Sequence, residues 1–128
     1  MFTANQLLAH LVGDFLLQAD WMAREKGRNS FACLVHVVIY ALPFLLITQN
    51  PSTLGVIAGT HFLIDRWQLP RYLIWIKNIP FPGIRPWSEC SKTGYPPDLP
   101  DHLSRWLYII VDSTFHLLIN GLAIFYLG

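Results

Sequence analysis

The chain has 128 residues, the length of a single domain, and 53% of them are hydrophobic while only 13% are charged. An ordinary soluble domain carries roughly 25% charged residues, so this composition argues against that class and indicates a membrane protein. The formal net charge of +1 provides no concentrated basic face, which excludes a nucleic-acid partner.

The apolar segments, taken in chain order, predict four transmembrane helices. A helix that crosses a bilayer core of about 30 Å needs about 20 apolar residues. Four segments approach that length: about 4–23, 30–48, 53–77 and 103–127. The third either continues through a kink near Pro70 or ends there and is followed by an amphipathic helix at the membrane surface. The predicted fold is all-α, a four-helix transmembrane bundle that forms one integral membrane domain over residues 1–128.

The segment 79–101 holds six of the nine prolines and cannot form a regular helix. It predicts a Pro-rich cytoplasmic loop between the third and fourth helices, either packed as a lid by its aromatic residues or loosely ordered as a linker. All nine Lys and Arg lie within 24–28 and 66–105. Because positive loops stay on the cytoplasmic side, both termini are expected outside.

The predicted spans contain seven ionisable side chains that could form one site. They are His10, Asp14, His36, His61, Asp65, Asp112 and His116. Six of them form three His/Asp pairs spaced by four residues, which places both members of a pair on one helix face. Antiparallel helices would set the histidines in one layer and the carboxylates in another. We expect ligand atoms from different helices within about 5 Å of a common centre.

Buried carboxylates need a compensating positive charge, because an Asp at mid-span costs about 2.5–3.5 kcal/mol. The spans contain no Lys, and Arg66 is the only Arg near enough. The seven side chains are therefore predicted to bind one or two divalent ions, Zn or Mn/Fe. A carboxylate not occupied by metal would act as general base, so the candidate catalytic residues are Asp14, Asp65 and Asp112.

Three further polar residues, Gln18, Asn120 and Arg66, are expected to hydrogen-bond to these ligands. Two other interpretations of the polar stripe stay open. The same side chains could form a proton or ion path, or a metal-free hydrogen-bonded network that fixes helix register.

Five segments carry a resemblance to a known family: "AHLVGDFLLQADWMAREK", "LVHVVIYALPF", "THFLIDRWQLPRYLIWIKN", "TGYPP" and "VDSTFHLLIN". They resemble an uncharacterised family of small bacterial and phage membrane proteins, a domain of unknown function. The resemblance implies a multi-pass protein of the bacterial inner membrane and no particular activity. In general pattern only, the chain is also similar to membrane-bound metal-dependent hydrolases.

Residues and resemblance together favour an integral membrane metalloprotein that acts as a hydrolase on a lipid-like or amphipathic substrate. Its partner would be membrane lipid, with a membrane protein as a further candidate. The alternative is a non-enzymatic membrane protein, either an ion or proton conductor or a phage-type module that binds a host membrane protein.

Overall fold

The computed structural model describes residues 1–128, and all of its regular structure is helical. The expected all-α class is confirmed. The chain divides into two compact units, one formed by 1–67 with 116–128 and the other by 68–115. The long C-terminal helix α7 (Asp101–Leu127) contributes to both units.

The N-terminal part of the first unit is an interrupted helix. Helix α1 (Ala4–Leu11) begins at Thr3, whose hydroxyl accepts a hydrogen bond from the Gln6 amide, and it passes into a π-helical turn, η1 (Val12–Leu16). Ala19 is extended, and α2 (Asp20–Glu25) follows. The helix expected over 4–23 is therefore broken: Gly13 lies in the π turn, and no Gly or Pro marks the break at 17–19. Tertiary contacts override helix propensity here, as is common where a π turn positions a functional side chain.

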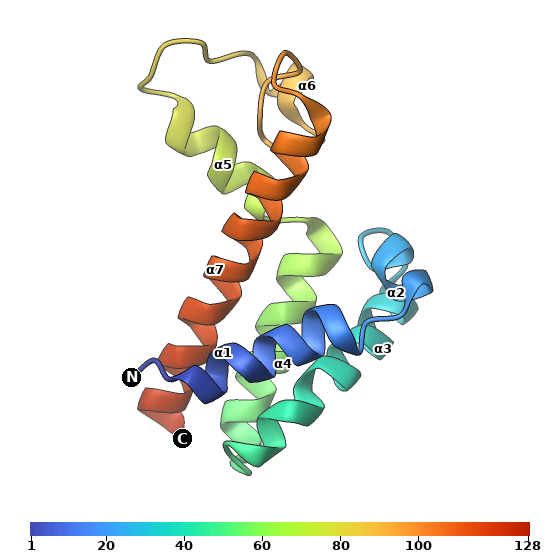
Figure 1. Cartoon of the computed structure of the whole chain (residues 1–128), viewed down its shortest axis with the longest axis vertical. Helices are drawn as coiled ribbons and strands as arrows, with labels where there is room; N and C mark the ends of the chain where they lie inside the picture. Colours follow the sequence, from blue (N-terminus) through green and yellow to red (C-terminus); the bar gives the residue numbers. More distant parts are fainter. The chain divides into compact units, whose positions relative to one another are not determined.

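Helices α3 (Ser30–Ala41) and α4 (Pro51–Trp67) lie side by side in the first unit (Figure 1). The Asn29 side chain accepts hydrogen bonds from two amides of the first turn of α3, and Pro43 lies in the 3₁₀ turn η2 (Leu42–Leu46) that ends this segment. The Cys33 thiol donates to the Phe62 carbonyl at 3.6 Å, which links the two helices.

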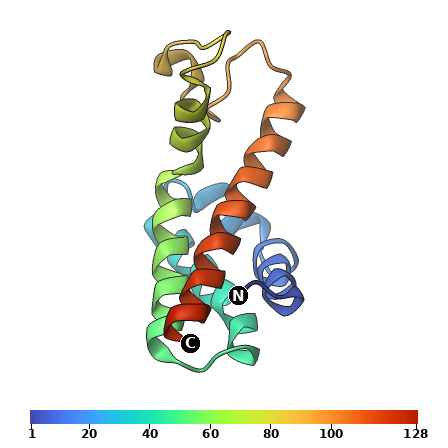
Figure 2. The same ribbon diagram turned by 90° about the vertical axis from the view of Figure 1, so that its left-hand side faces the viewer.

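The apolar core of the first unit is small and gathers around one aromatic residue. It consists of Ala9, Tyr40, Phe44, Ile57 and Ala123. Gly13 allows η1 to approach α3, because a Cβ there would lie 2.7 Å from Cδ2 of Tyr40. The C-terminal part of α7 lies beside α4, and the two chain ends are close to one another (Figure 2).

The second unit contains α5 (Pro70–Asn78), the short α6 (Trp87–Cys90) and the N-terminal part of α7. The segment expected as one helix over 53–77 forms two helices. Gln68 has φ +52, which ends α4, and Pro70 begins α5, where its missing amide hydrogen costs nothing. The segment 79–101 packs on α5 through its aromatic residues: the Tyr72 and Trp87 rings stack at 4.8 Å, and Trp75 Nε1 donates to the Arg85 carbonyl.

Only α7 is long and apolar enough to cross a membrane on its own, a criterion that buried helices of soluble proteins also meet. Helices α1, α3 and α4 have 8, 12 and 17 residues. The lengths of the regular helices therefore do not support four transmembrane spans, because the chain breaks its apolar segments with turns that sequence periodicity does not reveal.

Candidate metal centre

The interior of the first unit contains many polar side chains beside its small apolar core. Its buried polar side chains are Gln6, His10, Asp14, His36, Thr48, Thr53, His61, Asp65, His116 and Asn120. Large apolar side chains of the same helices face outward, including Leu16 and Leu46, which are 75% and 92% exposed. Ordinary soluble cores bury far fewer charged and polar side chains and expose fewer large apolar ones.

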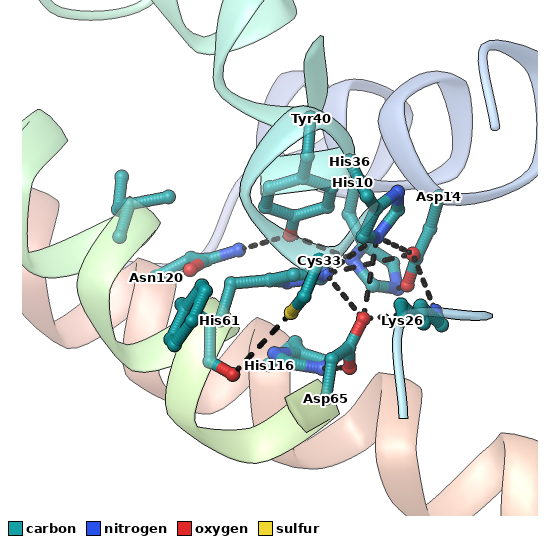
Figure 3. Close-up of polar contacts among 12 residues, drawn as sticks. His10, Asp14, Lys26, Cys33, His36, Tyr40, His61, Asp65, His116 and Asn120 are labelled. Atoms are coloured by element: carbon teal, nitrogen blue, oxygen red, sulfur yellow. Dashed lines mark hydrogen bonds and ion pairs between the residues drawn. The ribbon is translucent and has the colours of Figure 1, made fainter. Parts of the chain in front are cut away.

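Four buried side chains from three segments bring one ligand atom each to a common point (Figure 3). The His36 Nε2 atom lies 3.0 Å from His61 Nε2 and 3.2 Å from one oxygen each of Asp14 (Oδ1) and Asp65 (Oδ2). The His61 Nε2 atom lies 3.6 Å and 3.1 Å from the same two oxygens. We call these four residues the His36/His61 centre.

The separations among these atoms fit a four-coordinate metal ion. With metal–ligand bonds of about 2.0–2.1 Å, the ligand atoms of a tetrahedral site lie about 3.3–3.4 Å apart. The five separations above range from 3.0 to 3.6 Å, and all four atoms lie within 4.8 Å of one another. The buried His/Asp group can therefore hold a metal ion with little movement of its ligands.

Hydrogen bonding within the protein leaves this centre incompletely satisfied. The Asp14 Oδ1 and Asp65 Oδ2 atoms are buried, and neither accepts a hydrogen bond of good geometry. The Nδ1 atoms of His36 and His61 are also buried without a hydrogen-bond partner. Two Nε2 atoms 3.0 Å apart repel unless one carries a proton or both direct their lone pairs at a cation. A metal ion would remove this repulsion and bind both oxygens.

Local backbone geometry determines whether one or both residues of a His/Asp pair reach the His36/His61 centre. In the regular helix α4, the four-residue spacing directs both His61 and Asp65 inward. In the N-terminal segment, Asp14 lies in the π turn, where the Leu17 amide donates to the Val12 carbonyl five residues earlier. The wider turn changes the angle between His10 and Asp14, so Asp14 reaches the centre while His10 lies behind it.

His10 is held by a hydrogen-bonded pair rather than by the centre. The Asn120 amide donates to the Tyr40 hydroxyl at 2.7 Å, and that hydroxyl lies 2.8 Å from Nδ1 of His10. Since an amide nitrogen only donates, the Tyr40 proton is available to Nδ1, which places the proton of a neutral His10 on Nε2. That atom faces Asp14 Oδ2 at 3.8 Å. His10 is thus placed to orient Asp14 through the oxygen that does not face the centre.

His116 lies beside Asp65, as His10 lies beside Asp14. Its Nε2 lies 3.1 Å from Asp65 Oδ1, the oxygen that does not face the centre. The His61 ring is stacked between two other rings, with centroids 3.8 Å from Tyr40 and 3.9 Å from His116. Imidazoles and carboxylates therefore meet in one cluster instead of the two separate layers expected from antiparallel helices.

Lys26 supplies a positive charge beside the buried carboxylates, where a metal ion or Arg66 was expected to supply it. Its Nζ lies 2.8 Å from Asp65 Oδ2 and 3.9 Å from Asp14 Oδ1. Arg66 instead donates to the Ser30 hydroxyl and the Gly27 carbonyl, and so fixes the loop before α3. The expected role of Arg66 is corrected: the α2–α3 loop brings a lysine into the carboxylate pair because the first helix ends early.

The remaining expected site residues are Gln18 and Asp112. Gln18 is half-buried in the break between η1 and α2, and its buried Oε1 accepts no hydrogen bond. Asp112 lies on the part of α7 that belongs to the second unit, one turn before His116, and is half-buried. The His36/His61 centre thus unites His36, His61, Asp14 and Asp65, while His10, His116 and Asn120 lie around it.

A protein-family model described as "Protein of unknown function (DUF3307)" matches residues 2–127. The chain belongs to this family. The DUF3307 match fits the uncharacterised family expected from the sequence. No curated protein and no solved structure matches the chain.

Two residues that contact the site were not among the expected ones. Tyr40 lies four residues after His36, so the helical spacing used for the His/Asp pairs would have placed it on the same face. No helical spacing in the sequence pointed to Lys26. Its approach to the carboxylates depends on the break at 17–19 and on the loop that follows α2.

Proposed function

We propose that this DUF3307 protein is a membrane-embedded metalloprotein that binds one divalent ion, zinc or else manganese or iron, at the His36/His61 centre and hydrolyses a lipid-like or amphipathic substrate. The observation that carries the proposal is the set of four buried ligand atoms, which all lie within 4.8 Å of one another and of whose six separations five are 3.0–3.6 Å. Two imidazole nitrogens and two carboxylate oxygens are a ligand set that suits these metals.

Charge also supports a divalent ion. The two carboxylates carry two negative charges in a buried site, and Lys26 neutralises one of them. Buried charges that lack a partner are expensive, so a dication bound to both carboxylates is favourable. The Asp65 oxygen that does not face the centre is hydrogen-bonded to His116, which is the kind of outer hydrogen bonding that fixes metal ligands in position, and the corresponding Asp14 oxygen lies 3.8 Å from His10.

Placement in a membrane is supported by the exposed apolar side chains of the first unit. In the first unit, α1, α3 and the C-terminal part of α7 expose large apolar side chains and bury several polar ones; examples of the exposed residues are Leu8, Phe31, Val38, Leu118 and Phe125. A continuous apolar exterior of this kind is unfavourable in water and suits hydrocarbon. The interrupted helices would then lie in the bilayer with their irregular backbone covered by neighbouring helices.

Hydrolysis is the reaction that this ligand set serves best. A bound divalent ion lowers the pKa of a coordinated water and polarises a carbonyl or phosphoryl oxygen. Four protein ligands fill a tetrahedral site, so catalysis requires a fifth position or the release of one carboxylate. Lys26 marks the side from which a further ligand can enter, because its side chain is 21% exposed whereas those of Asp14 and Asp65 are 4% and 3% exposed.

The metal is tested by elemental analysis of detergent-purified protein. We expect about one equivalent of metal in the wild type and loss of that metal in Asp65→Asn. The matched control is Asp20→Asn, because Asp20 is exposed and pairs only with the exposed Arg24. The Co²⁺-loaded protein should give the intense visible absorption of a tetrahedral site. A folded wild type that binds no added Zn, Mn, Fe or Co contradicts the proposal.

A second candidate is a metal-free proton or cation path. It is favoured by the Lys26 ammonium, which already lies 2.8 Å from Asp65, and by the polar contacts that continue from Asp65 to His116 and from Asp14 to His10. Reconstitution in vesicles distinguishes the two functions. A conductor dissipates an imposed proton gradient without metal, whereas a metallohydrolase leaves the gradient intact and loses metal and activity together on chelation.

A further inference from the structure

Lys26 is the one member of the buried charge cluster that reaches solvent. Its ammonium contacts both carboxylates of the His36/His61 centre, at 2.8 Å from Asp65 Oδ2 and 3.9 Å from Asp14 Oδ1. Those are the same two oxygens that complete the tetrahedral ligand set. The lysine and a metal ion would therefore compete for the same two atoms.

The backbone at Lys26 is fixed, while its side chain is long and flexible. The Lys26 amide donates to the Met22 carbonyl, and the Asn29 amide donates to the Glu25 carbonyl. The Arg66 guanidinium holds the neighbouring Gly27 carbonyl at 3.1 Å. The Cα of Lys26 thus stays beside the centre, and only the four-carbon chain and its ammonium can change position.

Metal binding changes the charge around this ammonium. A dication bound to Asp14 and Asp65 neutralises both carboxylates and adds positive charge within a few ångströms of Nζ. The attraction of the Lys26 ammonium to these two carboxylates is then weakened and the metal repels it, in surroundings that screen charge poorly. An anion placed between the metal and the ammonium would remove this repulsion.

Resting on the proposed function, we infer that Lys26 is a substrate-binding residue and that the substrate carries a phosphate group, one oxygen of which faces the metal while another accepts a hydrogen bond from Nζ. A tetrahedral oxyanion has oxygens to contact both cations at once, and lysine is a common phosphate ligand. The phosphate belongs either to a lipid headgroup or to a soluble phosphate ester, since both present the same group.

The detergent-solubilised full-length protein is loaded with metal, and the excess metal is removed. Calorimetry then measures the binding of inorganic phosphate. We expect Lys26→Gln to keep one equivalent of metal and to bind phosphate at least about tenfold more weakly than the wild type. Lys26→Arg should retain most of the affinity. Arg24→Gln is the matched control, because Arg24 lies two residues before Lys26 and pairs with Asp20 at the surface, and it should bind phosphate like the wild type.

Competition then identifies the source of the phosphate. Displacement of inorganic phosphate by phosphatidic acid in mixed micelles assigns a lipid headgroup, and displacement by glycerol phosphate alone assigns a soluble ester. Wild-type affinity in Lys26→Gln, or no phosphate binding by metal-loaded wild type, overturns the inference while the metal centre stands. A wild type that takes up no metal overturns the proposed function first and this inference with it.

Discussion

The Nε2 atoms of His36 and His61 lie 3.0 Å apart on adjacent helices, and each is within 3.2 Å of the same Asp65 oxygen. Side chains in the middle of two helices rarely direct two acceptor nitrogens at each other without a cation or a shared proton. We therefore expect either a cation or a shared proton between these two nitrogens.

His61→Ala should abolish stoichiometric metal binding. The substitution removes one of four ligands and leaves the carboxylates with Lys26 as their only close cation, so we expect metal affinity to fall by at least about 100-fold. Competition with a chelator of known affinity measures the change. His102→Ala is the control, because His102 is exposed on the first turn of α7. Equal affinity in the two variants would show that the metal binds elsewhere.

Lys26→Met should tighten metal binding. The ammonium no longer competes for Asp65 Oδ2 and no longer repels the dication, so we expect roughly tenfold higher affinity, equivalent to about 1.4 kcal/mol. The metal-free protein should unfold at a lower temperature than the metal-free wild type, because its two buried carboxylates lose their cation. Thermal unfolding with and without metal separates these two effects. Weaker metal binding in Lys26→Met would contradict competition.

Tyr40→Phe should weaken the support of Asp14 while keeping the ring that stacks on His61. The Asn120 amide and Nδ1 of His10 would both lose their partner, which costs about 1–3 kcal/mol for a buried polar group. We also expect about tenfold weaker metal binding, a smaller loss than in His61→Ala. Tyr126→Phe, at an exposed position near the C-terminus, is the matched control. Unchanged stability would mean that these contacts contribute nothing.

Gly13→Ala should destabilise the first unit, because the new methyl group would lie 2.7 Å from Cδ2 and 2.9 Å from the carbonyl oxygen of Tyr40. We expect a loss of about 1–3 kcal/mol in the free energy of unfolding. Gly59→Ala tests the same change where nothing lies within 4 Å, and helix propensity predicts a gain of up to about 1 kcal/mol there. Chemical denaturation in detergent compares the two. Similar effects in both variants would contradict the close packing of η1 on α3.

The membrane proposal predicts that the full chain stays in the membrane fraction after an alkaline wash. In a Cys90→Ser background, a cysteine introduced at Ser52 should react with an impermeant reagent added from outside, and one at Arg28 should react only after permeabilisation. Cys33 is fully buried and should contribute little labelling. Recovery of the protein in the soluble fraction, or reversed labelling, would rule out the expected topology.

Helical periodicity alone indicated the all-α class and placed the four residues of the His36/His61 centre among the seven expected ligands. His61 and Asp65 lie in a regular helix, where sequence spacing translates directly into a shared face. The position of Asp14 at the centre without His10 could not be derived in this way, because the π turn at Val12–Leu16 has no clear sequence signal. The contact of Lys26 with the two carboxylates could not be predicted either, because it depends on where α2 ends.

The expectation of four long spans came from composition, which counts apolar residues without locating turns. Gln68 and Ala19 each interrupt an apolar segment by adopting a non-helical backbone conformation. Neither residue type is a strong helix breaker, so the surrounding tertiary packing determines these breaks. Segment length in the sequence therefore overestimates helix length in the fold.

The stacking of His61 between Tyr40 and His116 has a consequence for the kinetics of metal uptake. With ring centroids 3.8 Å and 3.9 Å away on either side, the imidazole cannot flip about its Cβ–Cγ bond unless α3 and α7 move apart. An incoming ion thus meets a nitrogen that already points at it and needs no rotamer search. The slow event on the pathway is then the departure of the Lys26 ammonium, and the association rate should rise when that side chain is shortened.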